Sequence, residues 1–164
     1  MVLKLPKMKV QEIKKLINGE MLCRIAFKGA KYPYIAPFQY VYINGTLYFH
    51  FTDYGRKMKL LEIDNRVCVE IEKLQPDLSE YNFVSLRGNL NVVVDPEERA
   101  KVIEKMREEG RQKLSQNFLA AHGLNVTEGW SAFTPDKPLV IVKLETKEEI
   151  GIKSPQTLMN QTNF

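Results

Sequence analysis

The sequence predicts a mainly β domain with flanking helices, in which the strands close into a barrel. Short runs of alternating apolar and polar residues recur along the chain, and an Asn44-Gly45 pair between two of them is the strongest hairpin signal. Both faces of that hairpin are too apolar to be left in water, so a barrel interior must cover one face and helices or a second chain the other. Gly88, isolated inside a long strand, is typical of the bulges at which barrels bend.

Length and charge bound the class of protein. The 164 residues suffice for one domain with a real core, which we expect at residues 1–146, followed by a C-terminal tail at 147–164. The net charge of +4 is small, and acids and bases are interspersed, which argues against a nucleic-acid partner. Since lysines interrupt the first ten residues and no apolar run could span a bilayer, we expect no membrane partner and a cytoplasmic location.

The first elements are an amphipathic helix at residues 10–19 and a strand at 22–28. Alternation places one set of strand residues in the core and the other outside, namely Cys23, Ile25 and Phe27 against Arg24, Ala26 and Lys28. The outer set leaves room for a flat ligand at Ala26 with a positive group at its edge. An ordinary solvent-facing strand is an equally good interpretation of this segment.

The stretch from Thr46 to Lys57 organises the functional hypothesis. A strand to Phe51 is followed by a polar turn through Gly55 and then by a short helix that begins with Arg56 and Lys57. The free N–H groups at a helix start already carry partial positive charge, so two cations are unfavourable there. A bound phosphate would resolve this conflict. Two solvated basic residues on a helix are the alternative.

The second half of the chain supplies more strands and two covering helices. We expect strands at 66–72, 83–94 and 139–146, a helix that starts at Asp95-Pro96 and ends near Gly110, and a second helix at 112–122. The irregular segment after them contains Trp130 and Phe133, two large aromatic residues that must be buried.

Few side chains in this sequence suggest direct chemistry. Cys23 and Cys68 lie in strand-like runs without neighbouring ligands, so we predict buried thiols and no metal site. Neither a Ser/His/Asp set nor a glycine-rich phosphate loop is evident. Of the two histidines, His122 is most simply a helix-end residue, which leaves His50, on the outer face of its strand, as the candidate for a catalytic role.

The order of these elements resembles the flavin-mononucleotide-binding split-barrel family. The segments CRIAF, PYIAPFQYVYINGTLYFHF, GRK, RVCVEIE, FVSLRGNL and LVIVKLE carry the resemblance, and LYFH followed by GRK is its most specific part. The family includes the pyridoxamine 5'-phosphate oxidases and, closer in pattern, the nitroimidazole-resistance-like flavoproteins. The resemblance implies a homodimer of split barrels with flavin mononucleotide (FMN) in clefts at the subunit interface.

The resemblance also implies site residues. Arg24, Ile25 and Ala26 match the strand that passes the flavin ring and phosphate, and His50 with Phe51 matches the pair beside the ring. The phosphate clamp corresponds to Gly55, Arg56 and Lys57, and Ser85 to a polar residue that reaches the cofactor of the other subunit. His50 would donate to the flavin or to a reducible substrate near neutral pH, or it is a hydrogen-bonded residue at the dimer interface.

Several functions agree with this pattern. The leading expectation is an FMN-dependent oxidoreductase of pyridoxamine 5'-phosphate oxidase-like type that acts on a small-molecule acceptor. A deazaflavin-dependent reductase and a non-catalytic flavin-binding protein are the alternatives. The C-terminus lacks the tryptophan- and arginine-containing substrate segment of the true oxidases, which argues against pyridoxamine phosphate as the substrate.

Overall fold

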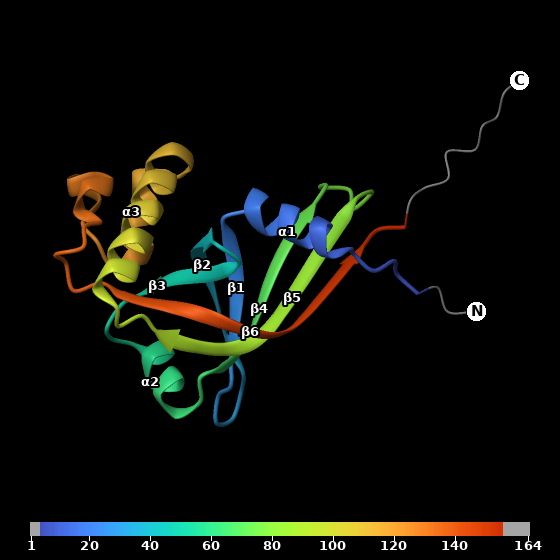
Figure 1. The fold of residues 1–164 in the computed structure, drawn as a ribbon, viewed down its shortest axis with the longest axis horizontal. Helices are drawn as coiled ribbons and strands as arrows, with labels where there is room; N and C mark the ends of the chain where they lie inside the picture. Colours follow the sequence, from blue (N-terminus) through green and yellow to red (C-terminus); the bar gives the residue numbers. More distant parts are fainter. Residues whose placement is uncertain (1–3, 156–164) are drawn as a thin grey trace, which may run out of the picture.

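Six strands form a closed barrel, as the sequence predicts. The computed structural model describes residues 4–155 (Figure 1). Every neighbouring pair of strands is antiparallel, and the order around the barrel is β1-β2-β3-β6-β5-β4. The strands are β1 (Leu22–Phe27), β2 (Tyr34–Ile43), β3 (Thr46–Phe51), β4 (Arg66–Leu74), β5 (Tyr81–Val92) and β6 (Val140–Lys153).

Two glycine-containing sites set the shape of the sheet, and both confirm the sequence analysis. Asn44 and Gly45 join β2 to β3 with positive φ angles of 49° and 86°, as a tight two-residue hairpin requires. The pairing of β5 with β6 shifts between Arg87 and Gly88, which marks a bulge at the expected glycine. The bulge lets one long strand bend around the barrel.

The barrel interior is filled by apolar and aromatic side chains. Phe49 and Phe51 of β3 are fully buried, and Phe38 stacks on Phe51 with ring centroids 4.8 Å apart. Helix α1 (Val10–Gly19) contributes Ile13, Leu16 and Ile17 to the same core, and the Tyr40 hydroxyl donates to the Ile17 carbonyl at 2.7 Å. This buried hydrogen bond fastens the helix to the barrel.

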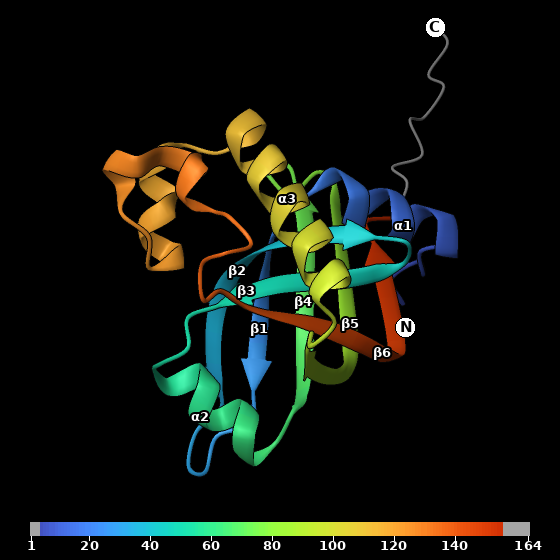
Figure 2. The ribbon, with the colours of Figure 1, turned by 60° about the vertical axis from the view of Figure 1, so that its left-hand side comes forward.

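A second apolar cluster covers the outside of β2, β3 and β6. Helix α3 (Pro96–Lys113) lies across this face (Figure 2) and packs Val102, Ile103 and Met106 against outward-facing strand residues such as Val41 and Ile141. Two 3₁₀ segments, η1 (Gln116–His122) and η2 (Val126–Ala132), continue this cover. Phe133 is fully buried and Trp130 nearly so, as expected.

Several boundaries differ from the predicted ones. Helix α3 does not end at Gly110 but continues to Lys113. The Trp130 ring packs where a Cβ of residue 110 would lie, so this glycine serves close packing within the helix. The helix expected at residues 112–122 is the 3₁₀ segment η1, capped by the Ser115 side chain. Cys68 is only partly buried, whereas Cys23 is buried as expected.

The largest difference concerns the end of the barrel domain, which we expected at residue 146. Strand β6 continues to Lys153 and pairs with β5 from Val142 to Lys153. This part of β6 lacks an alternating pattern because its buried contact is made by Gly151, which packs against Ile13 of α1. The remainder of the predicted tail, residues 156–164, lies outside the described residues. Within residues 4–155, no helix has both the length and the apolarity that crossing a membrane requires.

The bulge at Gly88 yields a stability prediction. A Cβ at this position would collide with the Glu145 carbonyl of β6, and backbone cannot move aside as a flexible side chain would. We expect Gly88→Ala to lower the free energy of unfolding by about 1–3 kcal/mol in urea denaturation. Gly19→Ala is the matched control, since a Cβ there meets open space. Equal stabilities for the two variants would show that the barrel does not depend on this close approach.

Candidate functional site

The start of helix α2 (Arg56–Ile63) carries an unusual concentration of unbalanced positive charge. Its N-cap, Gly55, has a φ angle of 94° and offers no side-chain hydrogen bond, and the first turn contains no acidic residue. Within residues 4–155, neither Arg56 nor Lys57 forms a salt bridge. The helix therefore begins with free N–H groups and two uncompensated cations.

Aromatic rings hold the two cations in place. The Arg56 guanidinium lies over the Tyr34 ring at 5.5 Å, and the Lys57 ammonium lies 5.9 Å from the Phe38 ring and 5.8 Å from the Phe51 ring. Burial lowers the pKa of Lys57. An anion beside this ammonium would offset the cost of burying it and favour its charged form.

A small pocket of about 80 Å³ lies next to Lys57. Its wall includes Pro37 and Gln39 of β2, His50 of β3 and His122 at the end of η1. The pocket thus connects the start of α2 with the outer face of β2 and β3, and residues of η1 form the remaining wall. Both histidines of the chain contribute to the same cavity, although 72 positions separate them in sequence.

The polar side chains of this pocket form a buried chain of hydrogen bonds. His50 Nδ1 lies 3.1 Å from His122 Nδ1, and the Nε2–H group of His122 donates to Gln39 Oε1 at 2.8 Å. Gln39, His50 and His122 are 2%, 7% and 6% exposed, respectively. The Gln39 Nε2 atom is buried and has no partner among the described residues. An unpaired buried amide donor is costly, so this atom marks a place for an acceptor.

Both histidines are uncharged at neutral pH. Burial lowers the pKa of His50 to about 3, with further contributions from His122, Lys57 and Arg99, and burial together with Lys57 lowers the pKa of His122 to about 4. Of the two roles that the sequence analysis offers for His50, the low pKa therefore argues against a donor that titrates near neutral pH. Its face of β3 is outward, as predicted, but η1 and Phe133 cover it and leave it 7% exposed, at the wall of the small pocket.

A second group of predicted residues lies on the outer face of β1, β4 and β5. The Arg24 guanidinium donates to Glu70 at 3.2 Å and to Glu72 at 2.6 Å, so its charge is already balanced across the β1–β4 pair. Ser85 Oγ lies 3.1 Å from Cys68 Sγ on the neighbouring strand. Ala26 and Cys68 line an open hollow of about 470 Å³ on this face.

The predicted site residues thus fall into three places. Lys57 and His50 line the small pocket, and Gly55 and Arg56 precede Lys57 at the start of α2. Arg24, Ala26 and Ser85 lie on the outer face of β1, β4 and β5. Ile25 and Phe51 are fully buried in the barrel core, so only their backbones could meet a ligand. The strand register brings the outer face of β1 next to the small pocket, because Arg24 pairs with Pro37, which lines that pocket.

Among the pocket residues that sequence reasoning missed, two are polar, namely His122 and Gln39. His122 does end η1, but its ring is buried against His50, which no local pattern indicated. Gln39 is the polar exception on an otherwise apolar strand face with Val41 and Ile43. A buried glutamine on such a face was the available signal, because a polar side chain in that position needs a partner.

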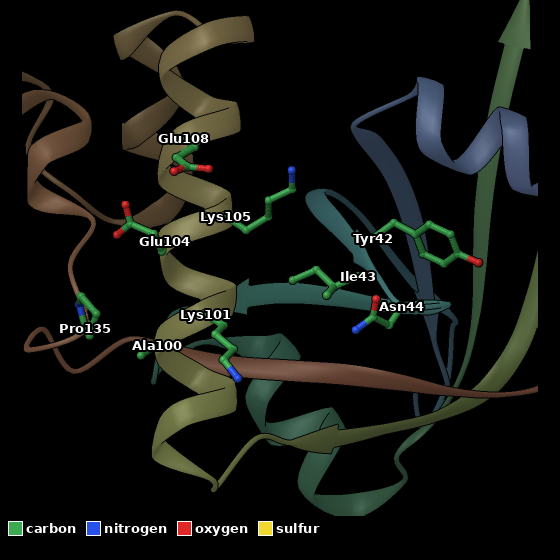
Figure 3. Close-up of a pocket in the computed structure, with 9 residues that line it drawn as sticks. All are labelled: Tyr42, Ile43, Asn44, Ala100, Lys101, Glu104, Lys105, Glu108 and Pro135. Atoms are coloured by element: carbon green, nitrogen blue, oxygen red, sulfur yellow. The ribbon is translucent and has the colours of Figure 1, made fainter.

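A larger hollow, of about 680 Å³, lies between α3 and the β2–β3 hairpin (Figure 3). Tyr42 and Ile43 line it from β2, and Lys101, Glu104 and Lys105 from α3. Charges of both signs border this hollow, and none of the predicted site residues reaches it. The small pocket beside Lys57 is therefore the better candidate site.

The neutral histidine pair predicts acid sensitivity. Since the folded pKa values of about 3 and 4 lie below the ordinary value of 6.5, only the unfolded chain binds these protons between pH 6.5 and pH 4, and stability falls as pH falls. Between pH 6 and pH 5 the pair should cost about 2 kcal/mol of unfolding free energy. His122→Phe should roughly halve this contribution, and urea denaturation along a pH series would measure it. An unchanged slope in the variant would contradict the buried neutral state.

Comparison of the sequence with models of protein families identifies one family. Residues 9–133 match the family model for pyridoxamine 5'-phosphate oxidase, which covers most of the barrel, α3 and both 3₁₀ segments. No curated protein matches the chain.

Solved structures share the fold at low sequence identity. A FAD-binding protein from Mesorhizobium loti is 16% identical, with a TM-score of 0.70 over 93% of this chain and 100% of that one. The FAD-binding protein of Mycobacterium smegmatis is 18% identical, with a TM-score of 0.59 over 90% and 97% of the two chains. A candidate 5-nitroimidazole antibiotic resistance protein from Bacteroides thetaiotaomicron is 21% identical, with a TM-score of 0.63 over 92% and 87%.

At these identities the structures establish the fold alone, which is the split barrel that the sequence pattern predicts. The family model adds the sequence relationship, since it matches far more than half of the chain. The chain belongs to the pyridoxamine 5'-phosphate oxidase family.

Proposed function

We propose that this protein binds flavin mononucleotide and serves as an oxidoreductase for a small acceptor. The observation that carries the proposal is the start of α2, where free backbone N–H groups, Arg56 and Lys57 meet without any acid in the first turn. A terminal phosphate has the charge and the acceptor oxygens that this arrangement needs. Membership of the family and the flavin-binding names of two structures of the same fold support the choice of a flavin.

The residues present fit such a phosphate. Gly55 leaves open space where another residue would place a Cβ, so an oxygen can approach the backbone closely. The guanidinium of Arg56 offers two parallel donors and the ammonium of Lys57 a compact charge. Their aromatic supports at Tyr34 and Phe38 limit the rotamer freedom that binding would otherwise cost.

From the phosphate site, the ring of the cofactor would extend along the outer face of β2. Pro37 and Gln39 continue from Lys57 along this face, and β1 places Arg24 beside Pro37 and Ala26 beside Ile35. The unpartnered Gln39 Nε2 donor suits a ligand oxygen. Ser85 would contribute from a second subunit, as the family resemblance implies. Once bound, a flavin supplies the electron-transfer chemistry, and the protein supplies position and electrostatics.

The spectrum of the purified protein tests the cofactor directly. We expect visible absorbance typical of a flavin and a released compound with the mass of FMN. A released mass of FAD would keep the flavin assignment and correct its identity, while a deazaflavin would favour the alternative reductase. Colourless protein that binds none of these compounds when offered an excess would reject the proposal. Oxidation of the bound reduced flavin by nitro compounds, quinones or oxygen would separate an enzyme from a flavin carrier.

The phosphate clamp predicts a specific loss of affinity. Replacing both cations in Arg56→Ala/Lys57→Ala removes at least two charge-assisted hydrogen bonds, so FMN should bind on the order of 100-fold more weakly or be absent after purification. Flavin fluorescence titration measures this change. Lys59→Ala is the matched control, because it removes an exposed cation one turn further along the same helix and should leave the affinity unchanged. Full flavin content in the double variant would refute the clamp.

We also propose that the protein is a homodimer with the cofactor at the subunit interface. Leu22, Ile35 and Ile150 are 44%, 62% and 39% exposed on the outer faces of β1, β2 and β6, next to the predicted ring site. Exposed apolar residues of this kind favour burial against a second chain. A partner there would also exclude water from Ala26 and Ser85.

Disrupting this surface should separate the subunits and release the cofactor together. We expect Ile35→Lys to shift the molecular mass measured by light scattering from dimer to monomer, with loss of bound flavin. Ile63→Lys is the control, since Ile63 is 81% exposed but lies on α2 and on none of these three strands, and should leave a dimer. A wild-type monomer that binds flavin would exclude the interface site.

A further inference from the structure

The two histidines of the chain are joined by a hydrogen bond between their Nδ1 atoms, and only one of these two nitrogens can carry the hydrogen. His50 Nδ1 and His122 Nδ1 lie 3.1 Å apart and are buried, so one nitrogen must donate while the other accepts. If both carried hydrogen the donors would clash, and if neither did the two lone pairs would repel. The protonation states of the two rings are therefore coupled.

Gln39 determines which of the two rings donates. Its Oε1 atom has only lone pairs to offer, so His122 must carry its hydrogen on Nε2 to form the 2.8 Å hydrogen bond. Since His122 is neutral, its Nδ1 atom is then a lone pair and accepts from His50. The hydrogen of the neutral His50 ring must in turn lie on Nδ1, which leaves His50 Nε2 as an acceptor.

We propose that Gln39 and His122 are positioning residues that hold His50 in its Nδ1–H form and so present His50 Nε2 to the bound ligand as a hydrogen-bond acceptor. Histidine in water prefers the opposite tautomer, with hydrogen on Nε2. The protein thus imposes the less favoured form by means of two hydrogen bonds in series. In this role His50 accepts a hydrogen bond from the ligand and does not supply a proton to it.

The surroundings keep this arrangement neutral. The charged groups that face His50 come from two other elements, Lys57 of α2 and Arg99 of α3, and both oppose a second positive charge. Arg99 is itself fixed by donation to the carbonyls of Pro135, Lys137 and Leu139. Among the described residues, no carboxylate forms a hydrogen bond or salt bridge with either histidine, so nothing stabilises an imidazolium.

Gln39, at the other end of this series of hydrogen bonds, lines the pocket together with Lys57. With Oε1 engaged by His122, its Nε2 donor is buried and has no partner among the described residues. A ligand oxygen that accepts from Gln39 would hold the amide in this orientation and, through His122, fix the hydrogen of His50. Occupation of the pocket and the tautomer of His50 are therefore linked. The inference rests on the proposed function only in taking that ligand to be the flavin or its electron acceptor.

Nitrogen-15 NMR of the cofactor-free protein, labelled at histidine, tests the tautomer at neutral pH. The experiment correlates the carbon-bound hydrogens of the imidazole ring with its two nitrogens. The nitrogen chemical shifts and the pattern of these correlations show which nitrogen carries the proton. We expect hydrogen on Nδ1 for His50 and on Nε2 for His122. A wild-type His50 with its hydrogen on Nε2 would overturn the proposal, and it would do so even if flavin binding were confirmed separately. Failure to bind flavin would leave this measurement unaffected.

Two variants of Gln39 provide a matched pair. Gln39→Met removes the acceptor for His122 and should release His50 into a mixture that contains the Nε2–H form. Gln39→Glu keeps an acceptor oxygen in the same place and should retain the Nδ1–H form of His50. Identical His50 signals in both variants would show that Gln39 does not set the tautomer.

A further pair separates hydrogen bonding from packing on η1. His122→Phe keeps a ring against Phe133 and Trp130 but removes the lone pair that His50 donates to, so the Nδ1–H form should be lost. Phe118→Leu alters a ring that packs on His122, at 5.5 Å between centroids, but forms no hydrogen bond to it, and should leave the tautomer unchanged. A persistent Nδ1–H form in His122→Phe would contradict the positioning role.

Discussion

Closure of the sheet is the constraint on which the rest of this structure depends. A strand that belongs to a closed barrel sends alternate side chains to the interior and to the outside, with no freedom to slip by one residue. In β3 this rule buries Phe49 and Phe51 and turns Tyr48 and His50 outward. An imidazole that is thus turned away from the core must be covered by another element if it is to be dry. Helix α3 and the 3₁₀ segments provide that cover.

The same constraint explains why positive charge accumulates where β3 ends. Lys57 lies against Phe38 and Phe51, whose rings belong to the barrel core, so its ammonium is partly withdrawn from water by the barrel itself. For a fully exposed lysine at a helix start, solvent screening keeps the repulsion from the free N–H groups small. A partly buried lysine without an acidic partner carries a real cost, and an incoming anion recovers that cost.

Two kinds of polar group therefore meet in one small cavity, a cation that lacks an anion and an amide donor that lacks an acceptor. Both deficits favour oxygen-rich ligands, and both are fixed in place by packing. The buried histidine pair adds a neutral, directional element between them. Because Gln39, His50 and His122 lie on three different elements, the cavity is defined only when β2, β3 and η1 are packed together.

The sequence by itself determined the barrel, because its signals are local. The Asn44-Gly45 turn, the isolated Gly88 and the alternation along β1 and β4 depend on neighbouring residues, and the structure confirms all three. The charge conflict at Arg56 and Lys57 was visible for the same reason. By contrast, the packing of Trp130 against Gly110 within α3 joins residues distant in sequence, so no local signal showed that this glycine lies inside the helix.

Only the tertiary structure decided what surrounds His50. The contact with His122 joins residues 72 positions apart, and the partner of His122, Gln39, comes from a third element. The strand pattern fixed the direction in which His50 points, but its charge and its hydrogen-bond partner depend on burial by η1. Periodicity records the face on which a side chain lies, whereas a pKa and a tautomer depend on everything that packs against that face.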